Sequence, residues 1–270
     1  MKLDDVKKLH QKKYRNQFGY YLVEGEHLIL ELHKARLSNS NTAAGAHLDD
    51  TQPIQLYVTE DYQQWANDLG GQYKILTVSK KQMEKLSDTK SPQGIVALVP
   101  LPKSYEENHP STDSASHLLR ANGKRNQGER SIYLHEVQDP GNLGTILRTL
   151  AWFGNFRLLL SPNSVDPFNP KVVRSSMGAI FHLPLELDVE LDDLQDRFDR
   201  FAYLDMNGTK TNDSSFDKYE CYLFGNEARG VPREKLAQFN ADAFTIPGSG
   251  SIESLNLASA VNMCAYQLSV

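Results

Sequence analysis

Hydrophobic and polar residues repeat with two different periods along the chain, and the periods predict two α/β regions. In the first region, short apolar runs typical of strands alternate with segments whose apolar residues recur every three or four positions. The predicted elements are a polar helix at 4–17, strand 20–23, helix 26–36, strand 54–58, helix 61–69, a Gly70-Gly71 turn, strand 73–78, helix 80–86 and strand 94–99. This alternation predicts an α/β domain over residues 1–100.

A second α/β region begins near residue 131. It is predicted to contain strand 131–137, helix 142–153, strand 156–160, strands near 201–204, 222–224 and 244–246, and a last helix at 256–268. Strand 156–160 is almost wholly apolar, which predicts a central position with both faces buried. The last helix has a wide apolar face that must pack on a sheet or on a second subunit.

Two segments interrupt this pattern. Residues 37–53 are small and polar and predict a loop, and residues 101–130 have few apolar positions and many serine, asparagine, proline and charged residues. The predicted organisation is therefore a first domain at 1–100, a flexible linker at 101–130 and a second domain at 131–270.

Composition narrows the class of protein. No apolar run approaches the ~18 residues of a membrane span, and the N-terminus lacks the apolar stretch of a secretory signal, so we expect a cytoplasmic protein. Cys221 and Cys264 lie in apolar stretches and are expected to be buried and reduced. The 8 histidines show no metal-type spacing, so no catalytic metal is expected.

Charge is unevenly distributed. The net charge is −5, but residues 1–130 hold 18 basic and 16 acidic side chains, whereas residues 131–270 hold 11 and 18. Six basic and two acidic side chains fall within the first 20 residues. This basic arm is compatible with RNA phosphate contacts and equally with a solvated helix face.

Three separated segments combine apolar runs with glycines and isolated polar residues: NLGTILR (142–148), FGNEARG (224–230) and IPGSGSIESLNLASA (246–260). In the first, Asn142 is a good N-cap for the helix, and Gly144 leaves space beside Arg148 on one helix face. In the second, Gly225 allows a close backbone approach and Glu227 sits in a tight turn. The third places a glycine-rich loop before a helix, an arrangement that also suits a nucleotide phosphate.

The order and spacing of these segments resemble the signature motifs of the SpoU (TrmH) family, RNA ribose 2′-O-methyltransferases of the SPOUT superfamily. The resemblance implies a parallel sheet with a C-terminal trefoil knot, a homodimer formed through the C-terminal domain, and S-adenosylmethionine as cofactor. The implied catalytic residues are Asn142, Arg148, Glu227, Ser254 and Asn256. The implied cofactor-binding residues are Leu204, Phe224, Gly225, Asn226, Gly230, Ile246, Pro247, Ser254, Leu255, Asn256 and Ala258.

The first region resembles the small substrate-binding domain that is often fused to this methyltransferase. Lys12, Lys13 and Arg15 are interleaved with Tyr14, which suits phosphate contact and stacking on unpaired bases. Of the adjacent Tyr20 and Tyr21, one is expected in the core because strand neighbours face opposite ways. A further segment, NPKVVRSSMGA (169–179), offers Lys171 and Arg174 to RNA, or places them on an ordinary helix surface.

The resemblance suggests a chemical role for Arg148. Guanidinium stays protonated in proteins, so we interpret Arg148 as an electrostatic partner of the RNA phosphate or of the developing alkoxide, oriented by Glu227 and Asn142. Ribosomal RNA is favoured over transfer RNA as substrate because of the separate N-terminal domain. The remaining alternatives are an RNA-binding protein without catalysis and an enzyme acting on a nucleotide phosphate.

Overall fold

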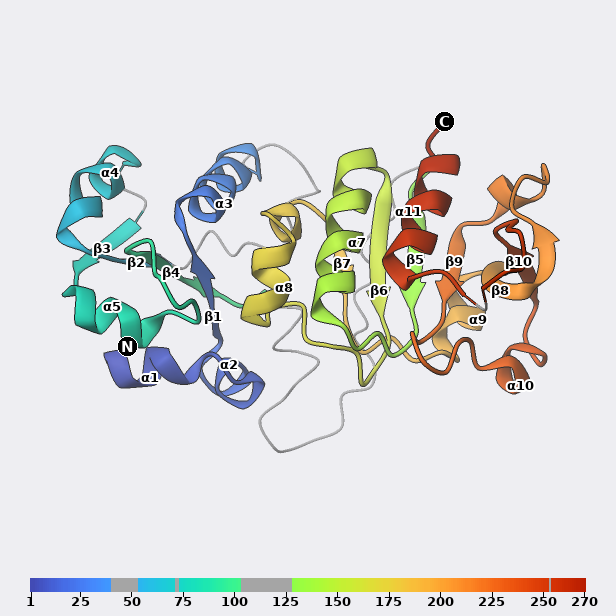
Figure 1. Ribbon diagram of the computed structural model, residues 1–270, viewed down its shortest axis with the longest axis horizontal. Coiled ribbons are helices and arrows are strands. Elements are labelled where there is room, and N and C mark those ends of the chain that lie inside the picture. Colours follow the sequence, from blue (N-terminus) through green and yellow to red (C-terminus); the bar gives the residue numbers. More distant parts are fainter. Residues whose placement is uncertain (40–52, 71–72, 103–127, 253) are drawn as a thin grey trace. The chain divides into compact units, whose positions relative to one another are not determined.

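The computed structural model describes residues 1–39, 53–70, 73–102, 128–252 and 254–270 (Figure 1). The predicted loop at 37–53 and linker at 101–130 therefore lie largely outside the described residues. The chain divides into two compact units. Unit 1 comprises Met1–Ala121 together with Asp166–His182, and unit 2 comprises Asn122–Val165 together with Leu183–Val270.

Unit 1 is built around a four-stranded mixed sheet of order β1-β4-β2-β3, in which only the β2–β3 pair is parallel. Its elements are α1 (Leu3–Lys8), α2 (Lys12–Phe18), β1 (Tyr20–Glu24), α3 (Glu26–Asn39), β2 (Ile54–Val58), η2 (Glu60–Tyr62), α4 (Gln63–Asp68), β3 (Tyr73–Thr77), α5 (Lys80–Leu86), β4 (Ile95–Pro100), α8 (Pro170–Ser175) and η3 (Ala179–Phe181). The predicted helix over 4–17 is two helices, because the chain turns at residues 9–11.

The core of unit 1 forms where helices cover this sheet. Val6 of α1, Leu9 directly after α1 and Met83 of α5 pack with Leu22 and Leu98 of the sheet, and all five side chains are buried. The strand period sends alternate residues to the opposite face. As expected for adjacent tyrosines in a strand, Tyr21 is buried while Tyr20 stays partly exposed.

Unit 2 is built on a six-stranded, wholly parallel sheet of order β10-β8-β9-β5-β6-β7. Its elements are β5 (Arg130–Leu134), α7 (Pro140–Phe153), β6 (Phe156–Leu160), β7 (Leu185–Glu186), α9 (Asp193–Arg197), β8 (Phe201–Lys210), η4 (Phe216–Lys218), β9 (Cys221–Phe224), α10 (Arg233–Leu236), β10 (Ala241–Thr245) and α11 (Leu257–Gln267). The predicted interior position of strand 156–160 is confirmed, since β6 pairs with both β5 and β7.

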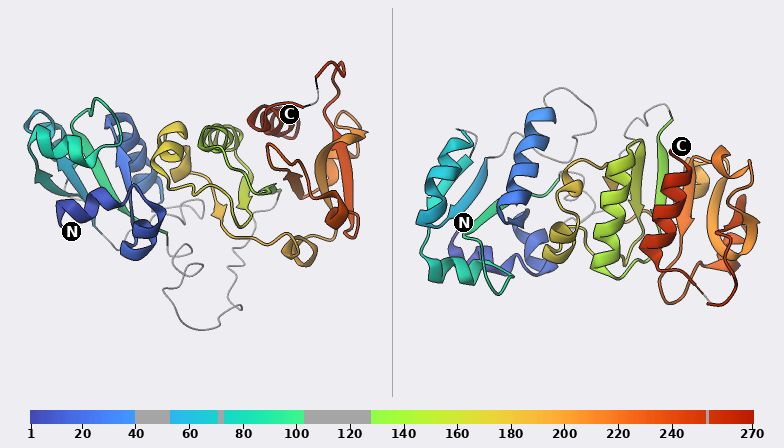
Figure 2. Two further views of the ribbon diagram at one scale, coloured as in Figure 1. Left: turned by 60° about the horizontal axis from the view of Figure 1, so that its bottom comes forward. Right: turned by 45° about the horizontal axis from the view of Figure 1, so that its top comes forward.

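Helices α7 and α11 lie side by side on one face of this sheet (Figures 1 and 2). They bury the apolar stripe of α7 and the Val261, Cys264 and Ala265 face of α11. A second cluster, which includes Leu194 of α9 and Leu236 of α10, packs with Tyr133, Leu159 and Leu223 of the strands. Both cysteines are buried and free, as predicted, and burial raises the pKa of the Cys264 thiol to about 12.

One segment differs from the predicted domain limits. Asp166–His182, which contains α8, groups with unit 1 although it follows β6 of unit 2 in sequence. The Phe168 ring packs at a tilt against Tyr21 of β1 with ring centroids 4.8 Å apart, and Asp166 pairs with Arg15 of α2. Sequence order alone predicted a single domain over 131–270, but the packing of this segment is long-range and leaves no local signal.

Within the described parts of the chain, no helix combines the length and the apolar character that crossing a membrane requires. The same residues contain no group of three or more His, Cys, Asp or Glu side chains arranged to hold a metal ion.

Candidate functional site

The parallel sheet of unit 2 brings the loops after β5, β6 and β9 to one edge, where α/β proteins commonly bind ligands. The loop after β5 leads into α7, whose N-cap is Asp139: its carboxylate accepts a hydrogen bond from the Asn142 backbone N–H at 2.7 Å. The prediction that Asn142 is the N-cap is therefore wrong. Pro140 at the first helical position moves the cap three residues upstream and leaves the Asn142 side chain available.

A chain of hydrogen bonds connects the three sequence motifs. The Asn142 amide donates from Nδ2 to the Glu227 carboxylate at 3.3 Å, and its Oδ1 accepts from Nδ2 of Asn256 at 2.9 Å. Glu227 also accepts hydrogen bonds from the backbone N–H groups of Gln138 and Asp139, at 3.1 and 3.2 Å. Residues up to 114 positions apart thus meet at one site.

The acceptor oxygens of Glu227 fix the orientation of both amides. A carboxylate only accepts, so Asn142 must turn its NH2 toward Glu227 and its oxygen toward Asn256. Asn256 must then donate through Nδ2, which leaves its Oδ1 to accept from the Ser259 backbone N–H at 3.2 Å and to cap α11. The Asn256 side chain therefore caps α11 and also donates a hydrogen bond to Asn142 of the first motif.

We expect Asn256→Asp to separate these two functions. Aspartate still caps α11, so the free energy of unfolding should change by less than about 0.5 kcal/mol. It cannot donate to Asn142, so the amide chain reverses and an oxygen of Asn142 faces Glu227; we expect the activity of the site to fall about 10-fold. Urea denaturation and an activity assay measure the two quantities, and equal activity of Asn256→Asp and wild type would contradict the proposed linkage.

Arg148 lies on α7 two turns beyond the N-cap and is exposed. Within the described residues no hydrogen bond or ion pair joins it to Glu227 or Asn142, so the predicted orienting contacts do not form in the isolated chain. Its guanidinium projects from the helix face that also carries Trp152, one turn later, whose side chain is 84% exposed. The arginine is therefore accessible to a ligand or to a partner.

The second motif forms a closed turn. Asn226 and Gly230 exchange two backbone hydrogen bonds, at 3.0 and 2.9 Å, and present Glu227, Ala228 and Arg229 at the tip. A Cβ on Gly225 would lie 2.3 Å from the Gly230 carbonyl carbon. Position 225 therefore requires glycine because the backbone of Gly230 approaches it too closely for a side chain, whether or not a ligand also binds there. Asn226 is buried and donates to the Glu136 carbonyl at 2.6 Å.

The predicted cofactor-binding residues lie in or just after three neighbouring strands. Leu204 lies within β8, Phe224 ends β9, and Ile246 and Pro247 follow β10, which pairs with β8. Leu255, Asn256 and Ala258 lie at the start of α11, and Ser254 is exposed just before it. The Phe224 side chain is buried, so only its backbone can face a ligand.

Apolar side chains are exposed beside this site. Met206, Ile252 and Leu255 are 60%, 69% and 43% exposed, and each lies in β8 or in the loop before α11. Exposed apolar side chains at this edge of the sheet suit a ligand that carries an aromatic base.

A family model described as the SpoU rRNA Methylase family matches residues 129–266, and a model of the MRM3-like substrate binding domain matches residues 2–97. The chain belongs to the SpoU rRNA methylase family. The resemblance seen in the motifs is thereby confirmed, including the N-terminal substrate-binding domain.

Curated proteins that are similar to this SpoU family chain are named as rRNA methyltransferases. It is 27% identical over 271 residues to the 23S rRNA (guanosine(2553)-2′-O)-methyltransferase RlmP of Bacillus subtilis, covering 99% of this chain and 95% of that protein. It is 33% identical over 184 residues to the mitochondrial rRNA methyltransferase 3A of Danio rerio, covering 68% of this chain and 37% of that protein.

The solved structures support the same fold. A putative RNA methyltransferase of the TrmH family from Porphyromonas gingivalis superimposes with a TM-score of 0.74 at 25% identity, covering 98% of this SpoU family chain and 96% of that one. The AdoMet-bound SpoU methyltransferase AviRb from Streptomyces viridochromogenes superimposes with a TM-score of 0.76 at 21% identity, covering 98% and 96%.

In unit 1 of this SpoU family chain, Arg15 is not available for its predicted contact with RNA. Arg15 is 1% exposed: Nε and Nη2 donate to one oxygen of Asp166 at 3.0 and 2.6 Å, and Nη1 donates to the Leu9 carbonyl at 2.8 Å. It cannot reach phosphate. Lys12 and Lys13 are exposed, and the Lys13 ammonium lies 5.9 Å from the Tyr14 ring centroid.

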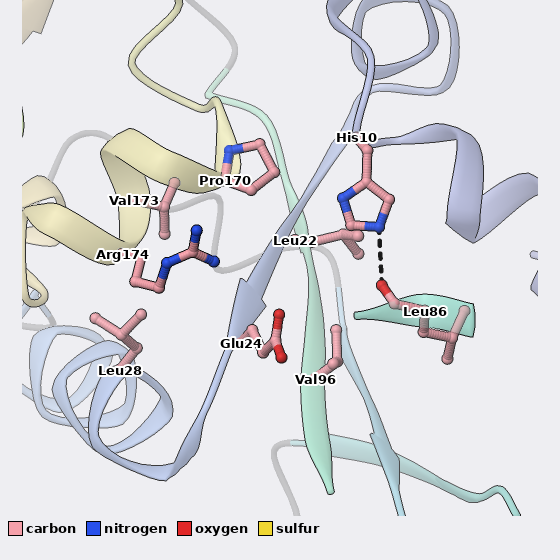
Figure 3. A pocket seen from close by; sticks show the side chains of 9 residues that line it. All are labelled: His10, Leu22, Glu24, Leu28, Leu86, Val96, Pro170, Val173 and Arg174. Carbon is pink, nitrogen blue, oxygen red and sulfur yellow. Dashed lines mark hydrogen bonds between the residues drawn. The ribbon is translucent and has the colours of Figure 1, made fainter. Parts of the chain in front are cut away.

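Helix α8 presents the other predicted RNA contacts of the SpoU family chain. Lys171 is exposed, and Arg174 lies 3.5 Å from the Asp88 carboxylate with both side chains about two-fifths exposed. Arg174 borders a small cavity of about 10 Å³ in unit 1, lined mainly by apolar residues, with Glu24 and His10 near it (Figure 3). Such a cavity holds about one water molecule and no nucleotide.

Sequence reasoning missed two contributors to the site of this SpoU family chain. Asp139 sets the start of α7, and Gln138 supplies a backbone N–H to Glu227. The Asp-Pro pair was a usable signal, since proline at the first helical position places the cap just before it. His135, at the end of β5, is half-buried, and burial lowers its pKa, so it is neutral near pH 7.

Proposed function

We propose that the chain transfers a methyl group from S-adenosylmethionine to a ribose 2′-hydroxyl of ribosomal RNA. The observation that carries the proposal is the chain of hydrogen bonds Glu227–Asn142–Asn256, which joins all three motifs at the carboxyl edge of the sheet. The B. subtilis relative, similar over 99% of the chain, is named for this chemistry on 23S rRNA.

The predicted residues in β8 and after β9 and β10 fit the cofactor. Leu204, Ile246 and Leu255 would cover its apolar parts, and backbone groups of Gly225 and Pro247 would meet its polar edges. When bound, the cofactor supplies a methyl group activated by a sulfonium centre. The hydrogen bond between Asn142 and Glu227 keeps the two motifs in fixed relative positions. Fixed positions of the groups around the substrates contribute to the rate of transfer.

Arg148 is proposed to stabilise negative charge during transfer. Its guanidinium remains protonated, so it acts on the RNA phosphate or on the developing alkoxide and does not remove the proton. Ser254, exposed before α11, completes the proposed catalytic set.

Unit 1 is proposed to bind the RNA. Exposed Lys12 and Lys13 on α2, with Lys171 and Arg174 on α8, provide four cations for phosphate contact, and Tyr14 provides a stacking surface. The match of residues 2–97 to a substrate-binding domain supports this assignment. Both named relatives act on ribosomal RNA, which favours it over transfer RNA.

A homodimer formed through unit 2 is also proposed. Trp152, Met263 and Tyr266 are 84%, 48% and 59% exposed on the adjacent helices α7 and α11, and such apolar area on a pair of helices is typical of an interface. Light scattering should give twice the chain mass of 30.4 kDa. The trefoil knot and the cytoplasmic location remain predictions.

The deciding experiment supplies labelled S-adenosylmethionine and RNA from cells that lack this protein. We expect label in alkali-resistant dinucleotides of ribosomal RNA, because a 2′-O-methyl group blocks alkaline cleavage. Label in transfer RNA alone would show that the substrate is transfer RNA and not ribosomal RNA. Absence of cofactor binding by calorimetry would reject the methyltransferase proposal.

A further inference from the structure

A polar cleft opens at the carboxyl edge of the unit 2 sheet. Its volume is about 450 Å³, within the range of small-ligand sites. Its lining residues are Glu136, Gln138, Asn163, Asn226, Ala228 and Arg229, which follow strands β5, β6 and β9. The cleft borders Glu227, which lies between Asn226 and Ala228 in the second motif.

The walls of this cleft are held by internal hydrogen bonds. Gln138 donates through Nε2 to the carbonyls of Glu136 and Asn163, at 3.0 and 2.7 Å. Buried Asn226 donates to the same Glu136 carbonyl and accepts from the backbone N–H groups of Ala228 and Arg229, at 2.9 and 3.0 Å. The NH2 groups of both amides are thus used inside the wall.

The groups that remain free are mainly acceptors. In the described part of the chain, Oε1 of Gln138 and one carboxylate oxygen of Glu136 have no hydrogen-bond partner, while the other Glu136 oxygen pairs with Arg229. The Asn163 side chain is exposed at the rim. The Arg229 side chain is 67% exposed, so one face of its planar guanidinium is open.

The backbone of the cleft is conformationally strained. Glu136 and Asn163 have φ values of 51° and 64°, and they are two of the five non-glycine residues with positive φ among the described residues. Left-handed backbone is unfavourable for residues other than glycine, and less so for asparagine. Such strain gathers at ligand-binding sites, where it orients side chains.

We propose that this cleft binds one unpaired nucleobase of the RNA substrate, with guanine preferred. The Arg229–Glu136 pair has no net charge, so the cleft does not select phosphate. The open guanidinium plane suits stacking on a base. Guanine presents adjacent N–H donors at N1 and N2, which match the free acceptor oxygens of Gln138 and Glu136. RNA sequence is read mostly on such unpaired bases.

The inference rests on the proposed function, but its test does not need catalysis. The full chain is titrated, without cofactor, into fluorescein-labelled pentaribonucleotides UUGUU, UUAUU, UUCUU and UUUUU, and into a fifth in which inosine replaces guanosine. We expect the guanosine oligomer to bind about 10-fold more tightly than the others, including the inosine oligomer, which lacks the N2 amino group.

Three variants localise the effect. Asn163→Gly removes the rim amide while keeping the positive φ, and Arg229→Ala removes the stacking plane; each should weaken UUGUU binding about 10-fold. The control variant Arg200→Ala removes a similarly exposed arginine that pairs with Asp242, and it should leave UUGUU binding unchanged. Equal binding of all five oligomers, no binding at millimolar concentration, or UUGUU binding unaltered in both cleft variants would overturn the proposal. Cofactor binding with no methyl transfer would instead count against the proposed function.

Discussion

Arg148→Ala should lower kcat for methyl transfer about 100- to 1000-fold, the usual effect of removing a group that stabilises charge in the transition state. The same change should leave folding almost untouched. Arg148 is exposed on α7 and makes no described hydrogen bond or ion pair, and alanine favours helix, so the free energy of unfolding should shift by less than about 0.5 kcal/mol. Single-turnover kinetics and urea denaturation measure the two quantities.

Two further variants sharpen this test. Arg148→Lys keeps the positive charge but loses the planar, two-pronged donor, so most of the activity should still be lost. Arg157→Lys is no suitable control because Arg157 is only partly exposed and forms ion pairs with both Glu129 and Glu186. The exposed Arg233 of α10, paired with Asp205, provides one: Arg233→Lys should keep wild-type kcat. Full activity of Arg148→Lys with an unchanged pH profile would exclude the bidentate role.

Arg15→Met should destabilise unit 1 by about 3–5 kcal/mol, because it leaves the Asp166 carboxylate buried without its partner. The two side chains are 2% and 5% exposed, and the guanidinium makes three hydrogen bonds. The loss should appear in urea denaturation as a lower midpoint for unit 1, with cofactor affinity unchanged because the predicted cofactor residues lie in unit 2.

The double replacement Arg15→Met with Asp166→Leu distinguishes a buried charge from lost packing. Removing both charges eliminates the unpaired carboxylate, so the double variant should recover more than half of the lost stability. A surface pair offers the comparison: Lys235→Met, which breaks the exposed Lys235–Asp192 pair, should cost less than about 1 kcal/mol. Equal losses for Arg15→Met and Lys235→Met would show that the buried pair contributes little.

The local elements were predictable wherever the periodicity was strong. The strands of unit 1 and helix α7 fall within one or two residues of their predicted limits, because alternation and an i, i+3, i+4 stripe are local properties. Short elements such as β7 and α9 gave no clear period and were missed. The predicted N-cap at Asn142 was wrong because Pro140 at the first helical position moves the helix start to Asp139.

Two assignments needed contacts that no local pattern encodes. Arg15 has the sequence surroundings of an RNA contact, in a basic arm beside tyrosine, but a carboxylate 151 residues away buries it. Likewise Glu227 was expected to support Arg148, whereas the fold directs its carboxylate to the Asn142 amide and two backbone N–H groups.

The sequence by itself determined the family, the two α/β regions and the residues of the three motifs, since these depend on residue type and spacing along the chain. The tertiary structure decided which of those residues meet. The side-chain contacts of the site and of the buried ion pair join residues that are 80 to 150 positions apart in the sequence. The order of the strands in the sheet and the need to neutralise buried charges determine which residues meet, and both are properties of the whole fold.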